Sequence, residues 1–291
     1  MSNEINEREL PEVRVDIDRV DAEIRNLFRE RMALADEVAR IKARTADEIF
    51  KPDREQAIIA RLTESIDPSI LKEYTAVIRR IMEISRKYQY GRTLELRDCL
   101  EIEPSPVQPQ VKTVICVDEE RELCSPVLEE NVAVLNAEHY AAAADAVLSG
   151  AADACVSVME EIGIGVNDGL HRILVEYPLY INSCRVLEKG GVRRKIVSCS
   201  PVLTADPQDN RVKLMFVCPN RSGSLASILS MIADYGVNLT EIHSKPDRHR
   251  DWNYYFMVEL GANILEKEIR AMLFQLKSET SDFRVLGSYR L

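Results

Sequence analysis

A heptad pattern of apolar residues near the start of the chain constrains the fold more than any other feature. One column of the heptad holds Leu10, Ile17, Ile24, Arg31 and Val38, and the other holds Val13, Val20, Leu27, Leu34 and Ile41. Glycine is absent from this stretch, so the pattern predicts one helix of roughly 50 Å, at about 1.5 Å per residue. Such a helix cannot bury its apolar stripe on itself. It needs partner helices from this chain or from a second copy.

Two shorter helices are predicted to follow. Pro52 and Asp53 are start signals for a helix over residues 51–62. An apolar stripe predicts a third helix over residues 67–92, with Gly91 as its stop. Residues 1–100 are therefore predicted to form an all-helical domain. The proline-rich, polar stretch 101–110 is predicted to be a linker.

Beyond the linker, strand-like and helix-like segments alternate, which predicts a small α/β lobe over residues 111–210. The segments are apolar strands at 111–117, 131–136 and 153–159, a helix at 137–150 and an extended run at 172–187. Residues 211–291 follow the order βαββαβ, which is the ferredoxin-like motif, with turns predicted at 219–223 and 247–251.

The composition excludes several classes of function. A formal charge of -10 disfavours nucleic-acid binding and leaves no polybasic patch for a membrane surface. No apolar run is long enough to span a bilayer, and the acidic N-terminus is unlike a signal peptide. Seven scattered cysteines without a C-x-x-C pair fit a reducing cytosol, so a cytoplasmic protein is expected. The four histidines lack metal-ligand spacing, and neither a metal nor a cofactor is expected.

Arg31 stands where the heptad calls for an aliphatic residue. An unpaired arginine in an apolar seam costs on the order of several kcal/mol. A salt bridge to Glu30, Glu37 or another acid is one explanation. A ligand is the other, because Lys42 lies three helical turns further along nearly the same face. Arg14 lies too far along the axis to reach Arg31's site, but it could serve the equivalent site of an antiparallel neighbour, which predicts a dimer.

Other polar residues belong with these cations. Ser85 and Gln89 are spaced i, i+4 and point the same way from the third predicted helix, and Arg54 and Glu55 open the second. The set offers no nucleophile with an activating base and no glycine-rich phosphate loop. Cations, an amide, a hydroxyl and one carboxylate suit a small polycarboxylate whose transition state needs electrostatic stabilisation.

The stretches "VRVDIDRVDAEIRNLFRERMALADEVARIK", "KPDRE" and "SRKYQ" resemble the all-helical chorismate mutases over roughly residues 10–92. The resemblance implies an intertwined helical dimer that rearranges chorismate to prephenate in one pericyclic step, without a covalent intermediate or a cofactor. Lys51 stands where some members of the family have an acidic residue. The substrate groups implied by the family fall on Arg14, Arg31, Lys42, Arg54, Glu55, Ser85 and Gln89.

The resemblance also implies a role for each group. Arg31 and Arg14 of the partner chain would clamp the two carboxylates, and Lys42 and Gln89 would donate to the ether oxygen. The remaining roles fall on Glu55 for the ring hydroxyl, Ser85 for the region of the ring carboxylate, and Arg54 for orienting its neighbours. The enzyme would hold the compact conformer of chorismate and stabilise charge on the ether oxygen.

The last eighty or so residues resemble the ACT domain that ends the bifunctional chorismate mutase–prephenate dehydratases. The resemblance rests on "NRSGSLASIL", "GVNLTEIHSKP" and "WNYYFMVEL". His243 and Lys245 replace a glutamate and an arginine of the family. A purely structural dimerisation module is the alternative, because amino-acid pockets and core turns use the same glycines. The resemblance implies that phenylalanine or another aromatic amino acid binds at a dimer interface through Gly223, Ser224, Leu225, Ala226 and Asn238.

Residues 137–187 resemble the first lobe of a prephenate dehydratase. The family's glutamate-asparagine-serine signature reads "MEEIGIGVND" here, with Glu161 or Ile162 in place of the asparagine. The threonine-arginine-phenylalanine motif is absent. Only about 25 residues separate "CRVL" from the first ACT strand, so the second lobe that would enclose prephenate is expected to be missing. A carboxylate at Glu161 would also repel a dianion.

Together these features predict a multidomain α and α+β protein. It would be a cytoplasmic, homo-oligomeric chorismate mutase of aromatic amino acid biosynthesis, with a degenerate dehydratase-like lobe at 111–210 and an ACT regulatory domain at 211–291. One alternative is a bifunctional mutase–dehydratase that makes phenylpyruvate. A second is a non-catalytic regulatory or scaffold protein. The intact set of polar seam positions argues against the scaffold.

Overall fold

The computed structural model describes residues 8–128, 130–219, 223–246 and 253–291. The chain forms two compact units, Met1–Asp98 and Cys99–Leu291. The middle of the turn predicted at 219–223 and the whole of the turn predicted at 247–251 lie outside the described residues. Among the helices that are described, none combines the length and the apolar character needed to cross a bilayer.

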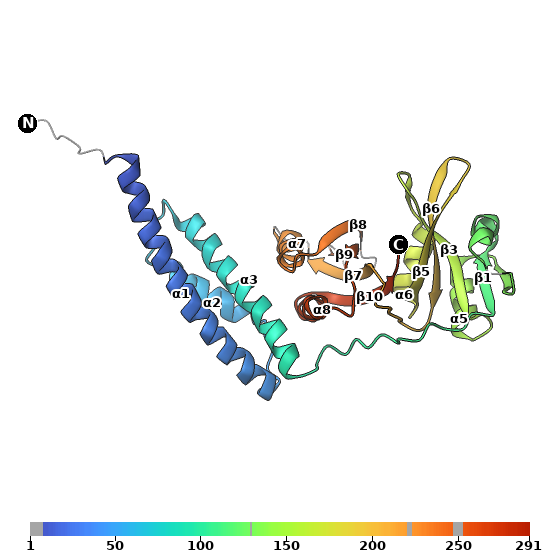
Figure 1. The fold of residues 1–291 in the computed structure, drawn as a ribbon, viewed down its shortest axis with the longest axis horizontal. Helices are drawn as coiled ribbons and strands as arrows, with labels where there is room; N and C mark the ends of the chain where they lie inside the picture. Colours follow the sequence, from blue (N-terminus) through green and yellow to red (C-terminus); the bar gives the residue numbers. More distant parts are fainter. Residues whose placement is uncertain (1–7, 129, 220–222, 247–252) are drawn as a thin grey trace, which may run out of the picture. The chain divides into compact units, whose positions relative to one another are not determined.

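From residue 8 onward, the N-terminal unit contains three helices, as predicted: α1 (Leu10–Thr45), α2 (Pro52–Thr63) and α3 (Leu71–Leu96) (Figure 1). The prediction that α3 stops at Gly91 is wrong. Tyr90 and Thr93 on either side of this glycine are buried, so packing carries the helix onward to Leu96. Arg97 then adopts an extended backbone conformation and ends it.

The face of α1 that packs within the chain is not its heptad stripe. Ala35 and Ala39 are the buried residues of α1, and their small side chains allow a close approach of α3. By contrast, the seam residues Ile24, Leu27 and Leu34 are 56%, 65% and 54% exposed. The helices of one chain thus leave a long apolar stripe uncovered, as expected if a second copy covers it.

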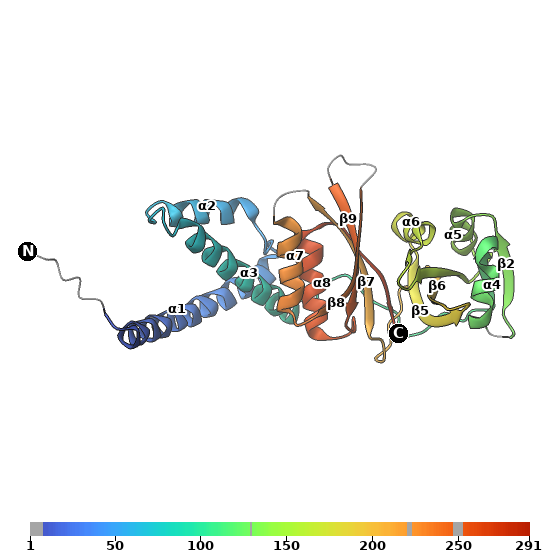
Figure 2. The ribbon, with the colours of Figure 1, turned by 90° about the horizontal axis from the view of Figure 1, so that it is seen from above.

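The C-terminal unit is built on one mixed sheet with the strand order β2-β1-β3-β6-β5-β10-β7-β9-β8, and β4 pairs with β3. The strands are β1 (Thr113–Val117), β2 (Ala133–Ala137), β3 (Ala154–Glu161), β4 (Gly165–Val166), β5 (Tyr180–Lys189), β6 (Val192–Ser200), β7 (Arg211–Pro219), β8 (Asn238–Pro246), β9 (Asn253–Gly261) and β10 (Ser281–Tyr289). The helices are α4 (Arg121–Cys124), α5 (Tyr140–Leu148), α6 (Asp168–Glu176), α7 (Ser224–Asp234) and α8 (Lys267–Glu279). The predicted βαββαβ order is confirmed, and α7 and α8 lie together on one face of its strands (Figure 2).

One predicted element is wrong. The run 172–187 was expected to be extended, but its first residues belong to α6. The Asn167 side chain accepts hydrogen bonds from the backbone N–H groups of Gly169 and Leu170 and so caps the helix. Leu170, Ile173 and Leu174 then form a buried stripe at helical spacing.

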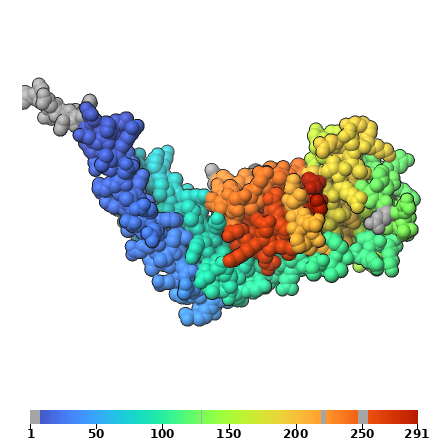
Figure 3. All heavy atoms as spheres, viewed as in Figure 1, coloured from blue at the N-terminus to red at the C-terminus, as the bar shows by residue number. Residues whose placement is uncertain are grey.

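A single glycine allows the lobe and the ferredoxin-like strands to share one sheet. Strand β10 pairs antiparallel with β7 and parallel with β5, where Gly287 faces Ile181. A Cβ atom on Gly287 would lie 2.4 Å from the carbonyl oxygen of Ile181, so a side chain there would clash with backbone. The chain end, dark red in Figure 3, therefore lies between the two halves of the unit. The domain boundaries proposed at 100, 110 and 210 remain predictions.

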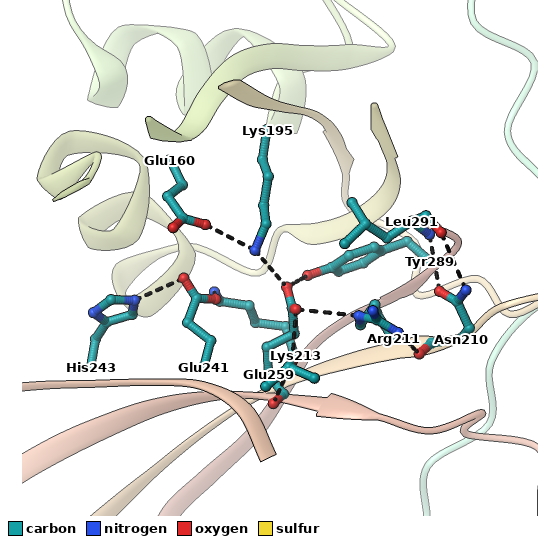
Figure 4. Close-up of polar contacts among 11 residues, drawn as sticks. Glu160, Lys195, Asn210, Arg211, Lys213, Glu241, His243, Glu259, Tyr289 and Leu291 are labelled. Atoms are coloured by element: carbon teal, nitrogen blue, oxygen red, sulfur yellow. Dashed lines mark hydrogen bonds and ion pairs between the residues drawn. The ribbon is translucent and has the colours of Figure 1, made fainter. Parts of the chain in front are cut away.

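A buried ion network spans this joint (Figure 4). Glu259 on β9 is 1% exposed and accepts a hydrogen bond from the Tyr289 hydroxyl at 2.7 Å. The Nζ atom of Lys195, on β6 of the lobe, lies 3.5 Å from the same carboxylate. Lys213 on β7 is fully buried and pairs with Glu241 on β8. The charges are paired across four strands, so the network holds the two halves of the sheet in register.

His171 on α6 lies beside this network as an uncharged ring. Burial, together with the charge of Lys213, lowers its pKa to about 3, and the opposing charge of Glu241 offsets only part of this. Its ring centroid lies 5.9 Å from that of His243, and Lys245 also contributes positive charge. Within the described residues, no group forms a hydrogen bond with either ring nitrogen. Protonation of His171 would thus place an unpaired charge in the core.

The substitution His171→Leu is expected to remove an acid sensitivity of the C-terminal unit. The pKa of His171 in the folded state lies below its unfolded value of 6.5. The free energy of unfolding that the neutral ring contributes is therefore fully present above pH 6.5 and is lost as the pH falls toward 3. At pH 5 the loss is about 2 kcal/mol, from roughly 1.4 kcal/mol per pH unit. Urea unfolding of both proteins at pH 8 and pH 5 measures it. An equal loss of stability in both proteins on acidification would contradict the assignment.

Candidate active site in the helical unit

A cavity of about 260 Å³ lies among the three helices of the N-terminal unit. Six of the seven residues predicted to bind substrate line it, and Arg14 does not. The polar lining residues are Arg31, Lys42, Lys51, Arg54, Glu55, Ser85, Arg86 and Gln89. Its apolar walls come from Val38, Ile49, Ile58, Leu62, Ile78, Ile81 and Met82. The helical spacing that motivated the prediction therefore does bring these groups to one place.

Arg31 reaches across from α1 to α3. Its guanidinium donates a hydrogen bond to Ser85 Oγ and a longer one, of 3.4 Å, to the carbonyl oxygen of Ile81. The salt bridge to Glu30 or Glu37 considered above is not found, and none of the described carboxylates lies within ion-pair distance of Arg31. Burial lowers the pKa of Arg31, and the charge of Glu55 offsets this only in part. Arg31 is thus a half-buried cation without an anionic partner of its own.

Lys42 is in a similar position. Its Nζ atom donates to the carbonyl oxygen of Ile49 at 2.9 Å, which leaves further ammonium protons to donate. Burial is the main cause that lowers the pKa of Lys42, the neighbouring charges of Lys51 and Arg54 lower it further, and the charge of Asp47 opposes the shift. A bound anion would relieve this unfavourable burial of positive charge.

The single carboxylate of the cavity has a partner that sequence reasoning missed. Arg86 Nη1 lies 2.6 Å from Glu55 Oε1 and 2.5 Å from Oε2. The signal was available, because Arg86 and Gln89 are spaced i, i+3 and so share a face of α3 with Ser85 nearby. The side chain of Gln89 donates to the Ser85 carbonyl oxygen at 3.2 Å, and its own carbonyl oxygen is buried without a partner among the described groups.

Arg14 lies on the same helix as Arg31 but well outside the cavity. The two residues are separated by 17 positions, or roughly 25 Å along the axis at 1.5 Å per residue. Arg14 is exposed. Within one chain it cannot contact a ligand in this cavity, and its action in the site of a neighbouring copy remains a prediction.

The sequence of this unit is similar to a known protein family. Residues 13–90 match the family described as chorismate mutase type II. The helical unit is a type II chorismate mutase domain. Residues 212–276 match the family described as ACT domain, so the mutase domain is followed by an ACT domain in the same chain.

The region between the two domains is similar to prephenate dehydratases. A relative from Aquifex aeolicus (strain VF5), described as a bifunctional chorismate mutase/prephenate dehydratase, is 22% identical over 357 residues, which cover 97% of this chain and 98% of the relative. Because this chain has 291 residues, more than sixty positions of that alignment stand opposite gaps here.

Solved structures show the same fold. A prephenate dehydratase from Arthrobacter aurescens, solved in complex with L-Phe, has a TM-score of 0.51 at 16% identity and covers 62% of this chain and 90% of its own. GqqA, described as a novel type of quorum quenching acylase, has a TM-score of 0.55 at 20% identity and covers 62% and 95%. At these identities the likeness establishes the fold and not the activity.

A tight hairpin in the middle lobe joins β5 to β6. Strands β5 and β6 are joined by Gly190 and Gly191, whose φ angles of 64° and 76° are those of a two-residue hairpin turn. The chain passes from β5 to β6 without any inserted residues that could form a second lobe at this position. Glu161 on β3, one of the two residues considered for the asparagine position of the dehydratase signature, lies 2.6 Å from Arg194 Nε on β6, so its charge is paired across these two strands.

The predicted effector residues are divided between two ends of the ACT strands. Gly223, with φ of 86°, precedes α7, and Ser224, Leu225 and Ala226 form its first turn after the end of β7. Asn238 begins β8, which runs parallel to β7 because both pair antiparallel with β9. Asn238 therefore lies at the opposite end of the strands. One chain does not bring the five residues together, and a shared pocket would need a second copy.

Proposed function

We propose that this protein converts chorismate to prephenate, in the biosynthesis of aromatic amino acids in the cytoplasm. The observation that carries the proposal is the charge balance of the cavity. Its acid, Glu55, is paired with Arg86, and the lining residue Lys51 is paired with Asp47 at 2.7 Å. Arg31 and Lys42 are cations for which the described residues supply no carboxylate, so the cavity is suited to a small dianion.

The geometry supports catalysis by positioning and electrostatics. Arg31 and Ser85 form a fixed pair that can bind one carboxylate, and Lys42 has free donors for the ether oxygen on which charge develops. The apolar walls exclude water and favour the compact conformer. No bond to the protein forms at any point, which suits a site without an activated nucleophile.

We propose that the active form is a dimer. The exposed heptad stripe of α1 provides an apolar surface for a second copy, and Arg14 of that copy would complete the pair of carboxylate ligands. A dimer built on the stripe would thus explain two separate features, the uncovered apolar seam and the distance of Arg14 from the cavity of its own chain.

The bifunctional alternative is the second candidate. Similarity along almost the whole chain to a relative described as bifunctional favours it over a mutase alone. The closed β5–β6 hairpin and the gaps in that alignment argue that any dehydratase chemistry here would need a site other than a cleft between two lobes.

Incubation of the purified chain with chorismate tests these candidates together. Prephenate and phenylpyruvate are both quantified over time, with Arg31→Ala as the matched inactive control. We expect prephenate to form with the wild-type chain and not with the variant. Formation of phenylpyruvate would establish a bifunctional mutase–dehydratase. If neither product forms, a non-catalytic scaffold protein would remain.

We also propose that the ACT domain binds an aromatic amino acid between two copies. The solved dehydratase in complex with L-Phe supports this class of ligand. The division of Gly223 and Asn238 between opposite ends of the strands supports a shared pocket. Calorimetric titration with phenylalanine, tyrosine and tryptophan identifies the ligand, and heat from none of them would support a structural dimerisation module.

A further inference from the structure

We infer that Arg86 is a positioning residue of the mutase site, which acts through Glu55 and sets how well the cavity accepts a dianion. The inference rests on the proposed function. It concerns a residue that the resemblance did not assign to the site and that the structure places on the cavity wall.

Arg86 joins three parts of the site. It projects from α3, and one of its terminal nitrogens contacts both oxygens of Glu55 on α2, at 2.6 and 2.5 Å. Its guanidinium carbon lies 4.7 Å above the ring of Phe50, in the segment that enters α2. The side chains of Arg86 and Glu55 are only 11% and 24% exposed. A contact this enclosed is screened weakly by water and fixes the carboxylate in one orientation.

The need for such a contact follows from the proposed substrate. Glu55 is the one acid lining a cavity that is proposed to hold two substrate carboxylates, and an unpaired Glu55 would repel them. Arg86 cancels this charge and still leaves lone pairs of Glu55 for a substrate hydroxyl, since an ionised carboxylate can accept about four hydrogen bonds. The pair thus keeps a hydrogen-bond acceptor in the site without a net negative charge.

The contact with Phe50 distinguishes arginine from lysine at this position. A planar guanidinium can lie over an aromatic ring while it holds a carboxylate, whereas an ammonium offers a point charge without that stacking. We therefore expect Arg86→Lys to retain only part of the wild-type function. The neutral variant Arg86→Met is expected to retain less.

A double-mutant cycle on chorismate turnover tests the inference. Arg86→Met is expected to lower kcat/KM by about tenfold to a hundredfold, mostly through a raised KM, because repulsion by Glu55 acts on the bound substrate and on the transition state alike. In a Glu55→Gln background the same substitution should change kcat/KM by less than about threefold, since the repelling charge is gone. Arg86→Lys should lie between wild type and Arg86→Met.

Arg92→Met is the matched control. Arg92 lies on the same helix, and its Nε lies 2.9 Å from Asp36 on α1, but it does not line the cavity. It should lower thermal stability without raising KM. An equal loss of kcat/KM from Arg86→Met in both backgrounds would overturn the inference, as would an equal rise in KM with Arg92→Met. A wild-type chain without turnover would instead refute the proposed function, and the inference would fall with it.

Discussion

Replacement of Lys42 by alanine is expected to lower kcat/KM for chorismate by about 10²–10³-fold, the usual loss when one preorganised donor to a developing charge is removed. Lys42 is half-buried, holds one backbone carbonyl and has no described carboxylate partner. Its removal therefore costs the folded protein little, because no buried charge is left unpaired. The effect should fall on turnover and not on folding.

Steady-state kinetics and circular dichroism on the same preparations measure the two quantities separately. Lys72→Ala is a suitable control, because Lys72 is an exposed lysine in the first turn of α3 and lies outside the cavity. The control should have wild-type kinetics. Full activity of Lys42→Ala would refute the proposed mechanism, and an unfolded variant would refute the claim that the residue serves catalysis alone.

Replacement of Lys213 by methionine is expected to destabilise the C-terminal unit by about 3–5 kcal/mol, which is typical when one partner of a buried ion pair is removed. The fully buried Lys213 pairs with Glu241, itself only 9% exposed. Burial would raise the pKa of Glu241, but attraction by Lys213, its hydrogen bond and that of His243 outweigh this and lower the pKa to about 2. Without Lys213, the buried carboxylate of Glu241 loses most of the attraction that offsets its burial.

Chemical unfolding followed by circular dichroism measures the loss. Lys277→Met is the control, because Lys277 and Glu101 form a pair with side chains 37% and 80% exposed, and surface pairs contribute at most about 1 kcal/mol. The folded-state pKa of Glu241 lies below its ordinary 4.5, so the stability it contributes is present above pH 4.5 and is lost as the pH falls toward 2. A Lys213→Met protein as stable as the control would show that the network is dispensable.

The long-range pattern of the sequence predicted the mutase domain well, and local signals predicted the lobe less well. The heptad of α1, the apolar stripe of α3 and the alternating pattern of the βαββαβ order each depend on periodicity, which the chain carries over many residues. The error at α6 had another origin, because a short helix begins at the Asn167 cap within a run of apolar residues that also suits a strand. At Gly91, packing of Tyr90 and Thr93 outweighed the local signal to stop.

Helical spacing linked Arg31 with Lys42 and Ser85 with Gln89, whereas the resemblance to the family supplied the full set of site residues and their roles. Arg86 was missed because a charged residue on an amphipathic helix ordinarily faces solvent. Its i, i+3 spacing from Gln89 indicated a shared face, and the ion pair with Glu55 on α2 shows that it lines the cavity. The role of Gly287 could not be predicted from the sequence either. Its close approach to Ile181 depends on which strands become neighbours, and that is a property of the whole sheet.

The approach of β10 to β5 at Gly287 has a consequence for regulation. An effector that binds the ACT strands meets a domain whose backbone is hydrogen-bonded to the lobe, with a buried set of ionic contacts across the same seam. Hinge bending between sensor and lobe would have to break these bonds. If the ACT domain binds an effector as proposed, the lobe and the ACT strands would therefore respond to it as one body.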